Sequence, residues 1–72
     1  MGDRDREPVE CGFFEVLRTT QDAILVSDDG EDGEWIPRSQ VSDESEIRDD
    51  AMIGDEGTLW LPEWLANEKG LV

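Results

Sequence analysis

The densest group of side chains able to do chemistry is the acidic stretch 28–32, in which four carboxylates flank Gly30. Carboxylate oxygens are the ligands that Ca²⁺ and Mg²⁺ prefer. The spacing departs from an EF-hand loop, because glycine stands third from Asp28 and Ser39 stands at the twelfth place, where a bidentate Glu is required. We therefore expect weak, unselective association with cations, with no dedicated metal site and no cofactor.

A second acidic run contains Glu44, Glu46, Asp49 and Asp50. Two interpretations stay open for it. It is either a solvated loop, or a strip of carboxylates at phosphate-like spacing that imitates nucleic acid in a channel lined by Lys and Arg. On the second interpretation these four residues bind a partner.

Trp60 is the remaining candidate for partner binding. In a strand it points away from Leu59 and Leu61. It is then either an exposed anchor, since Trp is enriched in interface hot spots, or a cover for the other side of a small core.

The sequence contains few of the residue types that enzymes use for catalysis. The sequence contains no His and no Tyr, so the usual general base near neutral pH is missing. Cys11 is the single cysteine and has no His to activate it. The glycines at 30, 33, 54 and 57 are not followed by the Lys-Ser or Lys-Thr of a phosphate-binding loop. We predict a non-enzymatic protein.

The charge is the strongest compositional signal. Twenty Asp and Glu stand against six Lys and Arg, which gives 72 residues a formal net charge of −14. Such repulsion opposes folding in dilute buffer and is screened at molar salt, where the Debye length falls to roughly 3 Å. Five of the six basic residues are Arg. This composition resembles that of halophiles that accumulate salt, and it also suits a nucleic-acid mimic.

Length and hydrophobicity limit the architecture. Seventy-two residues make one small domain, which we place at 9–72 behind a flexible tail at 1–8. Only 36% of the residues are hydrophobic, and low hydrophobicity with high net charge is typical of disordered chains. The periodic segments and the three Trp residues nevertheless indicate a folded domain. No apolar run reaches the roughly 18 residues of a membrane span, and the first residues do not form a signal peptide. The expected location is the cytoplasm.

The pattern predicts a mainly β fold of four or five short strands with one C-terminal helix, either a small SH3-like barrel or a strongly bent antiparallel sheet. The expected strands are 9–18, 23–26, 34–36, 58–61 and a short edge strand near Ile47. The expected core residues are Phe13, Phe14, Ile24, Val26, Trp35, Ile36, Leu59, Leu61, Trp64 and Leu65.

The C-terminal helix has the clearest local signals. Pro62 suits its first position, and Glu63 complements the positive end of the helix. Gly70 is the expected left-handed residue after the last turn, with Leu71 packing back in a Schellman cap. The helix should span 62–69, with Trp64 and Leu65 facing inward.

Two resemblances add to this interpretation. Residues 34–41, Glu-Trp-Ile-Pro-Arg-Ser-Gln-Val, resemble the end of an SH3-type barrel, without the acidic loop and paired aromatic residues that bind Pro-rich peptides. Residues 22–71, with Trp-Ile-Pro-Arg-Ser-Gln and Gly-Thr-Leu-Trp-Leu-Pro-Glu-Trp-Leu-Ala-Asn-Glu-Lys-Gly-Leu, are similar to small uncharacterised proteins associated with phages and mobile elements. That group implies an accessory role and assigns no catalytic residue.

The sequence therefore favours a small acidic module that binds another protein and is adapted to high salt. The alternative is an acidic mimic that inhibits a DNA- or RNA-binding protein. Direct nucleic-acid binding is not expected, because Arg18, Arg38 and Arg48 are scattered and form no basic stripe.

Overall fold

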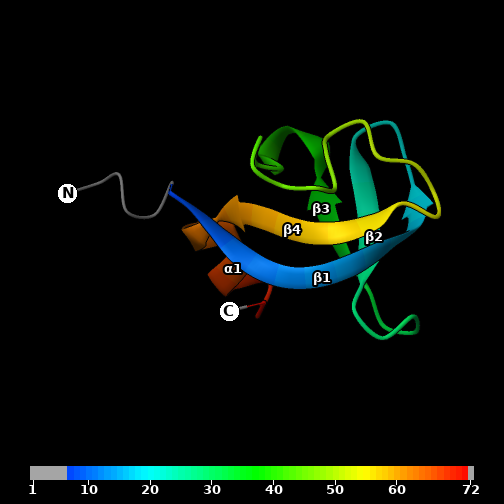
Figure 1. Ribbon diagram of the computed structural model, residues 1–72, viewed down its shortest axis with the longest axis horizontal. Helices are drawn as coiled ribbons and strands as arrows, with labels where there is room; N and C mark the ends of the chain where they lie inside the picture. Colours follow the sequence, from blue (N-terminus) through cyan, green and yellow to red (C-terminus); the bar gives the residue numbers. More distant parts are fainter. Residues whose placement is uncertain (1–6, 72) are drawn as a thin grey trace.

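The computed structural model describes residues 7–71 and shows one antiparallel sheet with a short helix packed against it (Figure 1). The four strands lie in the order β3-β2-β1-β4. Their bounds are β1 Pro8–Thr19, β2 Ala23–Ser27, β3 Glu34–Pro37 and β4 Glu56–Pro62. The first six residues, most of the expected N-terminal tail, lie outside the described part of the chain.

Strand β1 bends the sheet. It is 12 residues long and pairs with β4 along its first part and with β2 along its second (Figure 1). The register shifts between Glu10 and Gly12 and again between Val16 and Arg18, so β1 carries an irregularity at each place. Bulges of this kind bend a strand and increase its twist. The sheet is strongly bent and open, which confirms the bent-sheet form of the predicted fold rather than the closed barrel.

The core lies on one face of this sheet. Seven predicted core residues are buried: Phe14, Ile24, Val26, Ile36, Leu59, Leu61 and Leu65. Val16, Ile47, Ala51 and Ala66 are buried as well, although the pattern did not assign them to the core.

The prediction that three aromatic residues lie in the core is wrong. Phe13 is 60% exposed, and Trp35 and Trp64 are each 42% exposed. Successive side chains of a strand point to opposite faces, so burial of Phe14 and Ile36 turns Phe13 and Trp35 outward. Trp35 consequently lies at the surface, and Trp64 is exposed on the helix, whose buried residues are Leu65 and Ala66.

The fifth strand predicted near Ile47 is also wrong, because the described residues contain no strand there. Ile47 is nevertheless buried in a long connection between β3 and β4. This connection begins with the short 3₁₀ helix η2, Arg38–Gln40. It follows the outer edge of β4, where Ser42 donates its amide to the Trp60 carbonyl at 3.0 Å.

Arg38 fastens the far part of this connection. Its Nε donates to the Thr20 carbonyl at 3.0 Å, and its Nη1 donates to the carbonyls of Asp49 at 2.7 Å and Ala51 at 3.2 Å. One guanidinium therefore ties the connection to the β1–β2 turn. This contact keeps the buried Ala51 against the core.

The C-terminal helix α1 is Glu63–Glu68, with Pro62 and Lys69 as its caps. Gly70 has a φ of +71° and the Leu71 amide donates to the Ala66 carbonyl at 2.9 Å, which is the predicted Schellman cap. Leu71 packs against the core. No helix among the described residues is long and apolar enough to cross a membrane.

Candidate functional site

An apolar hollow of the surface lies between α1 and the hairpin of β2 and β3. We call it the tryptophan groove, and its volume is about 320 Å³. Its lining residues are Asp22, Ala23, Trp35, Pro37, Trp64, Leu65, Glu68 and Lys69. Two exposed indoles thus border one groove.

Local alternation explains both indoles. In β3, Ile36 is buried opposite Ile24 on the core face, so Trp35 stands on the outer face opposite Leu25. In α1, Leu65 and Ala66 provide the buried face. Trp64 precedes them and remains exposed. Trp35 of β3 and Trp64 of α1 therefore reach the same groove from different elements.

Charged groups also line the tryptophan groove. Asp22 and Glu68 line it and are exposed. Lys69 also lines it, and it lines a second hollow of about 210 Å³ together with Asp28 and Asp32. Lys69 thus stands between the groove and the acidic β2–β3 loop.

The acidic β2–β3 loop uses Asp29 to hold its own turn. Asp29 Oδ1 accepts hydrogen bonds from the amides of Glu31 at 2.9 Å and Asp32 at 3.0 Å, and from Ser27 Oγ at 2.8 Å. The pKa of Asp29 is lowered by the Glu31 amide first and by the Ser27 hydroxyl next. Among residues 7–71, no group of three or more acidic or Cys side chains is arranged to hold a metal ion.

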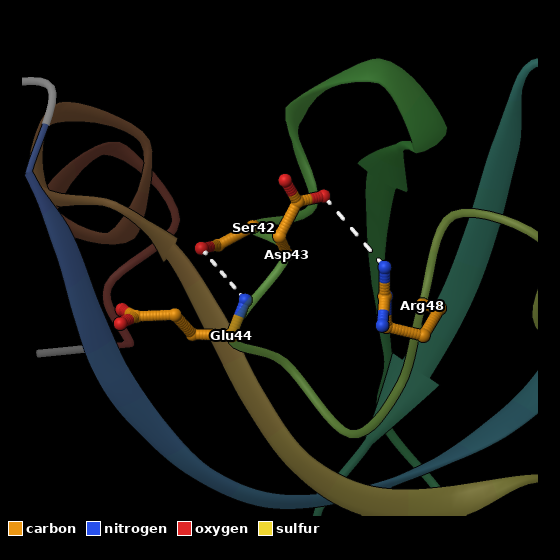
Figure 2. Close-up of polar contacts among 4 residues, drawn as sticks. All are labelled: Ser42, Asp43, Glu44 and Arg48. Carbon is orange, nitrogen blue, oxygen red and sulfur yellow. Dashed lines mark hydrogen bonds and ion pairs between the residues drawn. The ribbon is translucent and has the colours of Figure 1, made fainter.

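The four acidic candidates of the second run, Glu44, Glu46, Asp49 and Asp50, differ in their contacts. Glu44 is exposed, and its carboxylate points away from the Arg48 guanidinium in Figure 2. Its backbone amide donates a hydrogen bond to Ser42 Oγ at 3.2 Å. Arg48 instead faces Asp43 at 3.8 Å, the one ion pair in the described part of the chain.

Glu46 has a structural role. Its Oε1 accepts the Thr58 amide at 2.8 Å, and this contact lowers the pKa of Glu46. Asp49 and Asp50 are exposed, and Asp49 also offers its carbonyl to Arg38. Of the four acidic candidates, Glu46 therefore binds the backbone of β4 through its carboxylate. The carboxylates of Glu44, Asp49 and Asp50 make no such backbone hydrogen bond within residues 7–71.

Trp60 is half-buried and lies opposite Glu10 of β1. It is absent from the tryptophan groove. Its carbonyl accepts the Ser42 amide, so it lies beside the start of the acidic connection. The structure thus places Trp60 and Glu46 at the β4 edge, whereas Arg38 ties Asp49 to the β1–β2 turn. None of these residues lines the groove.

Cys11 carries no activated thiol. It is half-buried, burial raises its pKa, and its Sγ lies 3.7 Å from the Val9 carbonyl oxygen. A raised pKa reduces the thiolate fraction that a nucleophile needs.

The tryptophan groove was not predicted from the sequence, although one local signal places an indole at the surface. Strict alternation in 34–36 allows only Trp35 or Ile36 to face the core, and assigning both inward hid the surface indole. Comparison of the chain with protein-family models, with curated proteins and with solved structures gives no match.

Proposed function

We propose that this protein is a non-catalytic module that binds another protein through the tryptophan groove. The observation that carries the proposal is that Trp35 and Trp64, each 42% exposed, line one groove of about 320 Å³. Trp anchors in a shallow hollow supply much of the energy of protein interfaces. Trp is highly buried on average, so two exposed indoles on one groove favour a binding role.

The charge sets the conditions in which the module works. The net charge is −14, and the described residues contain one ion pair with a separation of 3.8 Å between exposed groups. A weak surface pair offsets little of this repulsion. We propose that the surface is adapted to high salt, where screening permits both the folded state and the encounter with a partner.

Nucleic-acid mimicry is the competing proposal, and it depends on different residues. Glu44, Asp49 and Asp50 are exposed on the connection before β4 and free to face a basic channel. Glu46 is less suited to this role because its carboxylate already accepts the Thr58 amide. The two proposals therefore predict different mutational sensitivities.

The decisive experiment is crosslinking in native salt with three variants of the full chain. The first is Trp35→Ala combined with Trp64→Ala. The second is Phe13→Ala, a matched control that removes an exposed aromatic outside the groove. The third combines Glu44→Gln, Asp49→Asn and Asp50→Asn. Each captured protein is then purified and its affinity for every variant is measured.

We expect the tryptophan double variant to lose the partner while Phe13→Ala keeps it. Loss on the acidic triple variant alone would overturn the groove proposal in favour of mimicry. A partner whose affinity is the same for all three variants would overturn both. Circular dichroism of each variant at the same salt confirms that the fold is retained.

A further inference from the structure

We propose that the tryptophan groove binds an arginine side chain presented by a basic segment of the partner, an inference that rests on the proposed function. The groove combines two indole surfaces with exposed carboxylates on the same lining. Neither feature alone selects a cation. Together they match the apolar, planar and charged character of a guanidinium.

The indoles supply the first part of the recognition. Trp is the aromatic residue that attracts cations most strongly, through the negative face of its ring. Trp35 comes from β3 and Trp64 from α1, so the hairpin and the helix each contribute one indole to the groove. Arginine also stacks its flat guanidinium on aromatic rings and is more weakly hydrated than lysine. It therefore fits this lining better than an ammonium does.

The carboxylates supply the second part. Asp22 and Glu68 line the groove, and a carboxylate accepts paired hydrogen bonds from a guanidinium. At high salt the net charge of −14 acts only over a few ångströms, so these two carboxylates, which lie in the lining itself, supply the attraction for the guanidinium. Lys69 opposes it from the same lining, but Lys69 also borders the hollow that contains Asp28 and Asp32.

The size of the groove favours a single side chain. Its volume of about 320 Å³ stands at the lower end of the roughly 300–1,000 Å³ of ligand pockets. A second copy of this chain is a poor occupant, because its surface is rich in carboxylates and poor in the basic side chains that the lining would bind. Its Arg38 is also committed to three backbone carbonyls.

The test is a titration of the ¹⁵N-labelled full chain with four capped tripeptides, Gly-X-Gly, in which X is Arg, Lys, citrulline or Leu. The indole N–H signals of the three Trp residues are followed at a KCl concentration where the protein is folded. Citrulline has nearly the shape of arginine without the charge. Trp60 is an internal control because it does not line the groove.

We expect the arginine peptide to shift the Trp35 and Trp64 signals saturably while Trp60 stays unchanged. Its affinity should exceed that of the citrulline peptide at least about threefold, the range of a cation–π contact at partly exposed rings. Glu68→Gln and Asp22→Asn should weaken binding, and Lys69→Gln should strengthen it. These variants alter charge at exposed or half-buried positions and leave both indoles in place.

Equal affinity for the arginine and citrulline peptides would overturn the inference, as would the absence of any indole shift. Tighter binding of the leucine peptide would also overturn the inference. The proposed function would then still hold, with a groove that prefers apolar side chains. Arginine binding together with a partner that ignores the tryptophan double variant would overturn the proposed function instead. Concentration-dependent indole shifts without peptide would identify a second copy as the occupant and overturn the inference.

Discussion

Glu46 bonds both polar backbone groups of Thr58. Its Oε1 accepts the Thr58 amide at 2.8 Å, and its own amide donates to the Thr58 carbonyl at 2.8 Å. The neighbouring Gly57 leaves room for this contact, since a Cβ there would lie 2.7 Å from Glu46 Cβ. An exposed edge strand invites pairing with other chains, and this residue covers the edge of β4.

Replacement of Glu46 by Ala should lower the thermal unfolding midpoint, because the Thr58 amide then loses its acceptor. Glu46→Gln keeps an oxygen acceptor and should lower the midpoint less. Glu44→Ala is the matched control, since Glu44 is exposed and its amide, not its carboxylate, makes the bond to Ser42. Equal midpoints for Glu46→Ala and Glu44→Ala would contradict the bracing role.

The same contact predicts a pH dependence. The pKa of Glu46 is lowered from its ordinary value of 4.5 by the Thr58 amide, so the folded chain holds the charged form. A lowered folded-state pKa contributes stability above the unfolded value, which is lost as the pH falls through the folded value. The stability difference between the wild type and Glu46→Gln should therefore shrink as the pH falls below about 4.5. Urea unfolding of both proteins across this range measures it, and a constant difference would refute the linkage.

Arg38 should be far more important to stability than Arg48. Arg38→Met removes three hydrogen bonds to backbone carbonyls and should cost about 2 kcal/mol of unfolding free energy. Arg48→Met removes one exposed pair with a separation of 3.8 Å and should change it by less than about 0.5 kcal/mol. Urea denaturation at fixed salt compares them, and similar losses would show that Arg38 does not fasten the connection.

Gly70 should tolerate Asn better than Ala. Its φ of +71° lies in the left-handed region, where an ordinary side chain costs about 1 kcal/mol although no atom lies within 4 Å of the added Cβ. Gly70→Ala should lose about that amount and Gly70→Asn less, since Asn adopts this conformation more readily. Thermal unfolding of both variants measures these losses. An unchanged unfolding midpoint for Gly70→Ala would mean that the helix cap relaxes to accommodate the side chain.

Salt should stabilise the protein. Raising KCl from about 0.1 M to about 2 M shortens the Debye length from about 10 Å to a few ångströms and screens the net charge of −14. The thermal midpoint should rise by several degrees, followed by Trp fluorescence and far-ultraviolet circular dichroism. Neutralising Glu44, Asp49 and Asp50 together should flatten this rise. A midpoint independent of salt would favour the acidic surface as a binding face over solvent adaptation.

The sequence by itself determined the features whose causes are local. The strands over 9–18, 23–26, 34–36 and 58–61 were predicted close to their observed bounds, because their apolar residues alternate or cluster between turn residues. The end of α1 was predicted because a left-handed glycine and its cap involve only neighbouring residues. The net charge also needs no structure.

Only the tertiary structure decided which faces are buried. The register shifts in β1, the outward turn of Trp35 and Trp64, and the burial of Ile47 all depend on contacts between segments far apart in the chain. Glu46 illustrates the limit. Its sequence context marks it as one carboxylate among many, whereas the fold places it against Thr58, twelve residues away. A pattern of neighbours carries no information about such a contact. Alternation in 34–36 could have placed Trp35 at the surface, but only the fold brings Trp35 of β3 and Trp64 of α1 to one groove.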